Sequence, residues 1–275
     1  MSFSIKTNVS SLWAQQSLNA NGNQTQKLFG QLSSGKRVNS AQDDAAALAI
    51  GVDLISQLTS NNQAISNGGD ALSVADTADS ALGQAGDILG QLRQLAVESG
   101  DGALNDGDRN DLQQQANGLK AELDRIANST EYNGTALLNG SGNLGFQVGT
   151  DGDPSKSQIN ISQTDVTVSA LGLNSLDLST QNGAQSALAG IDGALSVISS
   201  TRSTLGAQAD QASSAIASAS QRSISLAAAN SRISDADIAQ TESDLTKNLI
   251  LGQANVAVLA QANQNGNAAL RLISA

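Results

Sequence analysis

The chain of 275 residues contains no cysteine, no histidine, a single proline and only 2 % aromatic residues. The absence of cysteine and histidine excludes disulfides, thiolate nucleophiles and imidazole bases, and it removes the usual ligands of transition metals. Adjacent carboxylates such as Asp43 and Asp44 point apart at a helix start, so they do not form an acid–base pair. We expect a protein that is not an enzyme, with no cofactor and no metal site.

Long apolar runs are absent as well. No window reaches 18 consecutive apolar residues, so we expect no membrane insertion. The N-terminal stretch MSFSIKTNVSSLWAQQ has one early lysine but neither the apolar core nor the cleavage site of a general secretory signal. Because a chain without cysteine is indifferent to the redox compartment, export by a different route is compatible with this composition.

Acidic residues are missing from both ends of the chain. Residues 1–42 contain four cations and no acid, and residues 245–275 contain two cations and no acid, although the whole chain has a net charge of −11. The negative charge therefore lies in the middle of the chain. Binding to nucleic acid needs clustered Lys and Arg that neutralise phosphates, so we expect no nucleic acid partner.

Apolar residues recur at helical spacing along four stretches of the sequence. Such a period predicts helices with a broad buried face, and a strict four-three spacing marks a coiled-coil seam. Arg202 interrupts the third seam, while Gly and Asn weaken the fourth. The seam positions are Val74, Ala75, Ala78, Ala81, Leu82, Ala85, Ile88, Leu89, Leu92, Leu95 and Ala96; Leu112, Ala116, Leu119, Leu123 and Ile126; Ala184, Leu188, Ile191, Leu195, Ile198, Leu205, Ala209, Ala212, Ile216 and Ala219; and Leu245, Leu249, Gly252, Val256, Leu259, Asn263, Gly266, Leu270 and Ile273.

The length of the third stretch predicts the fold class. A helix over residues 184–231 would be about 70 Å long, whereas a compact chain of this size has a radius of gyration of about 19 Å. We therefore expect a mainly α protein, a long antiparallel coiled-coil or helical-bundle rod. Turn dipeptides and short alternating runs predict a small β-hairpin region at about residues 133–180. Whether Gly68 and Gly69 break a helix is left open.

The paired aspartates at residues 43 and 44 start the acidic part of the chain. Ser40 or Asp43 is the expected N-cap of the helix that follows, with the carboxylates near the positive end of its dipole. The preceding stretch LSSGKRVNS contains Gly35 and Arg37 and is typical of a bent connector. We predict a domain junction at Gly35, Arg37, Asp43 and Asp44. The predicted organisation is residues 1–43 and 236–275 as the two parts of a terminal helical domain, and residues 44–235 as the rod.

The two terminal segments have thin apolar stripes and are rich in Asn, Gln and Ser. Neither segment buries enough apolar surface to fold alone, so we expect each to become ordered by docking on the other and on further copies of the chain. The residues expected to carry this assembly are Val9, Leu12, Trp13, Leu28, Leu32, Leu245, Leu249, Val256, Leu259, Leu270 and Ile273.

A calcium-binding alternative rests on the acidic stretch DGALNDGDRND at residues 101–111. With Gly107 as the invariant glycine of an EF-hand loop, Gly102 and Leu104 occupy ligand positions and Gln113 replaces the final glutamate. The pattern fails, and a capped turn between two helices is the preferred interpretation.

The stretch QLSSGKRVNSAQDDAAALAI closely resembles the N-terminal signature of bacterial flagellin. Three further stretches extend the resemblance over nearly the whole chain: QLRQLAVESG, LKAELDRIANSTEYNGTALLNG and SRISDADIAQTESDLTKNLILGQANVAVLAQANQ. The resemblance implies a structural subunit of the extracellular flagellar filament, with the terminal segments as paired helices that line an inner tube. The short region at residues 133–180 implies a minimal flagellin without large outer domains.

The resemblance also implies a set of partners. These are other copies of the chain, an export chaperone on the C-terminal segment, and the filament cap and hook-associated proteins, with export of the unfolded chain through the flagellar type III channel. In the family's site for toll-like receptor five, Gln91 stands in place of arginine and Gln115 in place of glutamate, and Leu95 alone is retained, so we expect weak or absent receptor binding. The alternative function is that of the hook–filament junction protein, which a polymerisation assay separates from a filament subunit.

Overall fold

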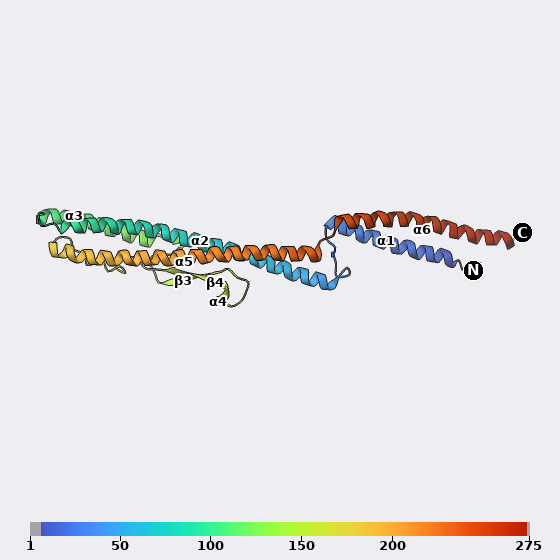
Figure 1. Cartoon of the computed structure of the whole chain (residues 1–275), viewed down its shortest axis with the longest axis horizontal. Helices are drawn as coiled ribbons and strands as arrows, with labels where there is room; N and C mark the ends of the chain where they lie inside the picture. Colours follow the sequence, from blue (N-terminus) through green and yellow to red (C-terminus); the bar gives the residue numbers. More distant parts are fainter. Residues whose placement is uncertain (1–6, 274–275) are drawn as a thin grey trace. The chain divides into compact units, whose positions relative to one another are not determined.

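A computed structural model describes the backbone of residues 7–273 and the side chains of residues 7–264. The elements in chain order are α1 (Val9–Ser34), α2 (Ala45–Ser99), α3 (Asp106–Ser129), β1 (Glu131–Tyr132), β2 (Thr135–Ala136), β3 (Gly142–Gln147), α4 (Pro154–Ser157), β4 (Gln158–Gln163), α5 (Gln181–Ser234) and α6 (Ile238–Ile273) (Figure 1). The prediction of a mainly α fold built from long helices, with a small β-hairpin region, is confirmed.

The chain divides into two compact units, each described by itself. One unit comprises residues 1–56 and 225–275, and the other comprises residues 57–224, so that α2 and α5 each contribute to both. The predicted junctions at residues 43 and 236 fall in the non-helical segments before α2 and before α6. The division into domains at those two residues remains a prediction.

In the unit of residues 57–224, α2 and α5 run antiparallel. The side-chain amide of Asn61 donates to the carbonyl oxygen of Ala219, Arg202 donates to Asp79, and Arg93 donates to Asp192. Partner positions in α5 fall as positions in α2 rise, which defines the antiparallel register.

One hydrophobic core joins α2, α3, α5 and the segment that precedes α5. Most predicted seam positions of the first three stretches are buried in it, and Leu95, Leu119, Leu188, Leu195, Ala209 and Ile216 are half-buried. Because the core is long and narrow, Ala contributes many of its contacts and allows the helix backbones to approach closely. The predicted helical faces of these three stretches are confirmed.

The capped turn expected at residues 101–111 is present at the start of α3. Asn105 accepts hydrogen bonds from the backbone N–H groups of Gly107 and Asp108, and the carboxylate of Asp108 accepts from the N–H of Asn105. This reciprocal capping box pairs backbone N–H groups at the start of the helix that have no partner within the helix itself. The acidic residues therefore start a helix here.

The β region consists of two short antiparallel hairpins. Asn133 and Gly134, both with positive φ, form the tight turn between β1 and β2, and β3 pairs with β4 from Gly142 opposite Gln163 to Gln147 opposite Gln158. The prediction of hairpins is confirmed up to residue 163. It is wrong for residues 164–180, which contain no strand, because hydrogen bonds to α3 side chains replace a strand ladder there.

Three side chains on one face of α3 hold that strand-free segment. Asp124 accepts from the N–H of Val168, Lys120 donates to the carbonyl of Asn174, and Gln113 accepts from the N–H of Leu178. The segment thereby buries Val166, Val168, Leu171, Leu173, Leu176 and Leu178 in the core.

Candidate assembly surface

In the unit of residues 1–56 and 225–275, α1 and α6 pack against each other along their length (Figure 1). The side-chain amide of Asn8 donates to the carbonyl oxygen of Ala262 at 2.9 Å, and that of Asn21 donates to the carbonyl oxygen of Asn248 at 2.9 Å. A β-bridge between Lys36 and Asp235 closes the other end of the pair. The two helices are therefore antiparallel, with polar contacts at intervals along their interface.

The inner face of this pair is built mainly from small and polar residues. Its buried members are Ser11, Ala14, Leu28, Thr241, Leu245 and Ala262. Gly252 leaves room for the side chain of Asn21 to reach across the interface to the carbonyl oxygen of Asn248. A Cβ added at Gly252 would lie 3.0 Å from the amide nitrogen of Asn21. Such an interface buries little apolar area, so its contribution to stability is small.

The predicted seam of α6 is only partly correct. Leu245 is buried and Leu259 is half-buried, whereas Leu249 and Val256 are 47 % and 54 % exposed. Thr241, Asn248 and Ala262 line the inner face in their place, because small side chains and hydrogen bonds determine this contact. The side chains of Leu270 and Ile273 lie outside the described residues.

The outer face of the pair carries large apolar side chains in contact with solvent. On α1, Val9 and Leu12 are each 54 % exposed and Trp13 is 67 % exposed, whereas Leu28 is buried and Leu32 is half-buried. Of the described residues, sixteen large apolar side chains are exposed, and thirteen of these belong to this unit. We define the outer face as Val9, Leu12, Trp13, Phe29, Ile238, Leu249, Ile250, Leu251, Val256 and Val258.

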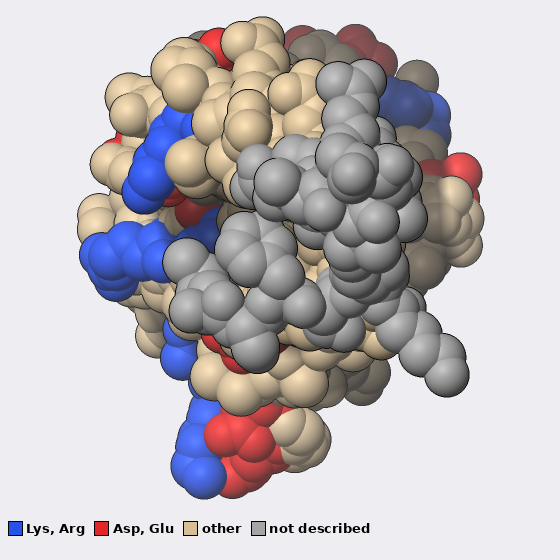
Figure 2. Space-filling model, turned by 90° about the vertical axis from the view of Figure 1, so that its right-hand side faces the viewer, with Lys and Arg blue, Asp and Glu red and all other residues tan. Residues whose placement is uncertain are grey.

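This concentration of apolar groups makes the outer face the candidate surface for association. In Figure 2, most of the surface that the grey atoms leave visible consists of uncharged residues, polar and apolar together. Exposed apolar clusters of this kind mark sites of association in proteins. Sequence analysis missed five residues of this face: Phe29, Ile238, Ile250, Leu251 and Val258. A helical-wheel plot of every apolar residue in the two terminal segments, and not only of those at seam spacing, would have included them.

The segment between α1 and α2 is held by backbone and charged contacts. Gly35 ends α1 in the left-handed region, with φ 68°, and its carbonyl accepts from the N–H of Ala236. The guanidinium of Arg37 donates to the carbonyl of Ile233 at 2.7 Å and lies 3.8 Å from the carboxylate of Asp44. The predicted junction residues Gly35 and Arg37 thus tie the start of the chain to the loop before α6.

Asp43 and Asp44 have different partners. Asp44 precedes α2 directly and accepts from the N–H of Ala47 at 2.9 Å, as an N-cap does. The expectation that Ser40 or Asp43 caps α2 is wrong, because Asp43 instead accepts from the N–H of Ser40 and forms an ion pair with Lys27 at 3.0 Å. The Lys27 contact, followed by hydrogen bonds from the backbone N–H groups of Asn39 and Ser40, lowers the pKa of Asp43 to about 2.

The receptor-site equivalents lie in the other unit. Gln91 and Gln115 are exposed on α2 and α3, and Leu95 is half-buried against the core.

Residues 7–273 include no group of three or more His, Cys, Asp or Glu placed to hold a metal ion. None of the described helices has both the length and the hydropathy of a membrane span.

Comparison with known proteins identifies the family. Residues 5–143 match the bacterial flagellin N-terminal helical region, and residues 188–273 match the bacterial flagellin C-terminal helical region. The chain belongs to the bacterial flagellin family, whose members are structural proteins of the flagellar filament and not enzymes.

Individual relatives support the same assignment. The chain is 36 % identical over 272 residues to the flagellin of Halalkalibacterium halodurans, a match that covers 98 % of this chain and 99 % of that protein. It is 41 % identical over 152 residues to flagellin B of Vibrio anguillarum, covering 55 % of this chain but only 40 % of that longer protein. The crystal structure of Bacillus cereus flagellin superposes with a TM-score of 0.50 at 27 % identity, covering 56 % of this chain and 88 % of that structure.

Proposed function

We propose that this chain is a minimal flagellin that self-assembles into the extracellular flagellar filament, and that the outer face of α1 and α6 is the surface that neighbouring copies bury. The observation that carries this proposal is that ten of the sixteen exposed large apolar side chains of the described residues lie on α1 and α6. A monomer gains little from leaving such groups in water. Their burial between copies supplies the driving force for polymerisation.

Residues 1–43 and 236–275 form the inner-tube domain in this proposal, and residues 44–235 form the surrounding rod. The polar inner face of α1 and α6 supports this division, because such a pair gains most of its stability from contacts with further copies. Val9, Leu12, Trp13, Leu249 and Val256 contact neighbouring subunits, whereas Leu28 and Leu245 hold the helix pair together.

We infer export of the unfolded chain through the flagellar type III channel, with an export chaperone on α6 covering exposed residues such as Leu249 and Val256 before assembly. The filament cap and the hook-associated proteins contact the terminal helices at the two ends of the polymer. Gln91 and Gln115 lack the charges expected at the receptor site, so binding to toll-like receptor five is weak or absent.

Seeded polymerisation tests the proposal. Sheared filaments are added to monomer, Trp13 emission and helical circular dichroism are recorded, and the products are imaged by electron microscopy. Trp13 is the only tryptophan and is 67 % exposed, so assembly is expected to shift its emission to the blue while filaments lengthen.

Matched variants assign the effect to the outer face. Val256→Ser is expected to raise the critical concentration about tenfold or more, since it removes apolar area from a surface that copies bury. Val197→Ser is the control, because Val197 is 43 % exposed in the other unit. Monomer that leaves wild-type seeds unchanged would contradict a filament subunit and favour the hook–filament junction protein.

A further inference from the structure

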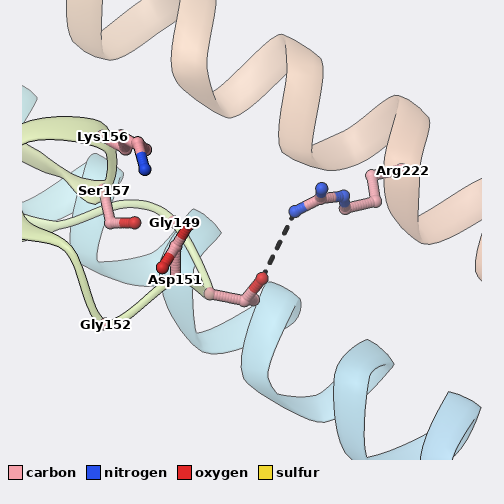
Figure 3. A pocket seen from close by; sticks show the side chains of 7 residues that line it. Gly149, Asp151, Gly152, Lys156, Ser157 and Arg222 are labelled. Atoms are coloured by element: carbon pink, nitrogen blue, oxygen red, sulfur yellow. Dashed lines mark hydrogen bonds between the residues drawn. The ribbon is translucent and has the colours of Figure 1, made fainter.

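A polar cavity lies between the β3–β4 connection and α5, within the unit of residues 57–224 (Figure 3). Its volume is about 520 Å³, which is in the range of small-molecule pockets. None of its lining residues belongs to α1 or α6, and nothing in the proposed function uses it. The cavity is lined by Gly149, Thr150, Asp151, Gly152, Lys156, Ser157 and Arg222.

Hydrogen bonds within the connection fix the shape of one wall. The side-chain amide of Gln147 donates to the carbonyl oxygens of Gly149 and Asp151, at 2.9 and 3.0 Å. The carboxylate of Asp153 accepts from the N–H and the hydroxyl of Ser155. Acceptor groups of the loop are therefore largely occupied by the loop's own donors.

The groups left facing the cavity are mainly donors. Ser157 is only 1 % exposed, and Figure 3 shows its hydroxyl turned toward the cavity. Gly149 packs directly on Ser157, where an added Cβ would lie 2.9 Å from the hydroxyl oxygen, so the wall is closed behind that group. Because this oxygen reaches the open space of the cavity, its O–H is available to a water or ligand atom there.

Arg222 faces this hydroxyl from α5. Its guanidinium contacts only the hydroxyl of Thr150, at 3.3 Å, and no carboxylate in the described part of the chain lies within ion-pair distance of it. Lys156 adds a second cation to the lining. Its ammonium also forms an ion pair with the carboxylate of Asp153 at 3.1 Å. With Asp151 counted, the lining has a net charge of +1 in a chain whose net charge is −11.

We propose that this cavity is an oxyanion-binding site, in which Arg222, Lys156 and Ser157 donate hydrogen bonds to a carboxylate or phosphate group. A planar guanidinium binds two oxygens of such a group at once, and charge-assisted bonds of this kind are the strong ones. The ligand group comes either from a free oxyanion or from an acidic side chain of a second copy. The second source rests on the proposed function: Asp and Glu outnumber Lys and Arg by 25 to 14, so a second copy offers many carboxylates to the site.

A titration of the monomer with inorganic phosphate tests the site itself. We expect saturable ¹H–¹⁵N shifts at Gly149, Gly152 and the Arg222 side chain, and a loss of affinity of about tenfold in Arg222→Gln. Arg125→Gln is the matched control, since Arg125 is an exposed arginine of the same unit paired locally with Glu122. The absence of saturable shifts, or an equal loss in Arg125→Gln, would overturn the proposal.

Seeded filament growth distinguishes the two sources. If an acidic side chain of a second copy occupies the site, Arg222→Gln raises the critical concentration several-fold, Arg125→Gln does not, and phosphate inhibits growth of the wild type. If the ligand is free, Arg222→Gln filaments grow like the wild type and phosphate has no effect. Wild-type chains that do not extend seeds contradict the proposed function, while the monomer titration still decides the oxyanion site.

Discussion

The side-chain amide of Asn61 in α2 donates a hydrogen bond to the carbonyl oxygen of Ala219 in α5 at 2.6 Å, and a second one to the hydroxyl of Ser223 at 2.8 Å. Asn61 is 2 % exposed. A buried amide with specific partners fixes the register of two helices whose apolar seams consist largely of interchangeable Ala, Leu and Ile.

Replacing Asn61 with Ala therefore removes a register contact from the helix pair. We expect Asn61→Ala to lower the free energy of unfolding by about 1–2 kcal/mol, because it leaves the Ser223 hydroxyl without this donor. Urea denaturation followed by circular dichroism measures the change. Gln63→Ala, at an exposed position two residues further on, should stay close to the wild type, and an equal loss in both variants would rule out a specific role for Asn61.

Adjacent glycines in α2 respond in opposite directions to the same substitution. α2 passes through Gly68 and Gly69 without a break. A Cβ on Gly68 would lie 2.7 Å from Cγ1 of Ile216, whereas a Cβ on Gly69 would meet nothing within 4 Å. We expect Gly68→Ala to destabilise the fold by about 1–2 kcal/mol through overpacking. Gly69→Ala should stabilise it by about 1 kcal/mol through helix propensity.

In thermal unfolding each of these two variants serves as the control for the other, since both replace a glycine of α2 with alanine. The melting temperature should fall for Gly68→Ala and rise for Gly69→Ala. Equal shifts in one direction would mean that the helix, and not the contact with Ile216, determines the response.

The ion pair of Lys27 with Asp43 makes the connector between α1 and α2 sensitive to acid. The pKa of Asp43 is lowered from 3.8 to about 2, chiefly by Lys27. Because the pKa is lower in the folded state, the contact stabilises fully above about pH 4, and this stabilisation is lost as the pH falls through about 2. Solvent screens the 42 % exposed Lys27 side chain, so we expect a contribution of about 1 kcal/mol.

Lys27→Met is expected to raise the pKa of Asp43 toward its ordinary value. The carboxyl ¹³C resonance of Asp43, followed in filaments from about pH 5 to about pH 1.5, gives this pKa directly. Lys36→Met removes a nearby exposed lysine as the control and should leave the pKa low. A low Asp43 pKa in Lys27→Met would assign the shift to the backbone donors instead.

The buried side chain of Arg109 holds the turn before α3 through hydrogen bonds to backbone carbonyls. It is 6 % exposed, and its guanidinium donates to the carbonyl oxygens of Asp101 at 2.7 Å and Leu104 at 3.4 Å. We expect Arg109→Met to cost about 2 kcal/mol, because two loop carbonyls lose their donor. Hydrogen exchange in residues 100–105 should accelerate as well. Arg125→Met, at an exposed site of the same helix, should change neither quantity, and wild-type protection in Arg109→Met would refute the assignment.

At Arg202 the seam pattern predicts an interruption of the apolar stripe but not the partner of the guanidinium. It interrupts the predicted seam of α5, but the packing continues on both sides of it at Ile198 and Leu205. The guanidinium lies at the margin of the interface and donates to Asp79 in α2 at 2.7 Å. A sequence pattern locates the interruption, whereas the identity of the partner depends on the register of two helices far apart in the chain.

The fourth seam shows the opposite case. A repeat of large residues predicted the inner face of α6, but Leu249 and Val256 are about half exposed, and Asn248 and Ala262 contact α1. In the proposed function, neighbouring copies bury Leu249 and Val256, and hydrophobic periodicity then identifies a face that is buried in the filament. It cannot state whether the partner is the neighbouring helix or another molecule.

The sequence by itself determined the mainly α fold, the long helices, the buried faces of α2, α3 and α5, the capped turn before α3 and the family. These properties depend on residue types at fixed local spacing, which backbone geometry converts directly into helices, caps and turns. The tertiary structure alone decided the N-cap at Asp44, the strand-free segment held by α3, the apolar outer face of α1 and α6, and the donor-lined cavity at Ser157 and Arg222. Each of these depends on the register between elements distant in sequence, which small differences in packing free energy select among many similar alternatives.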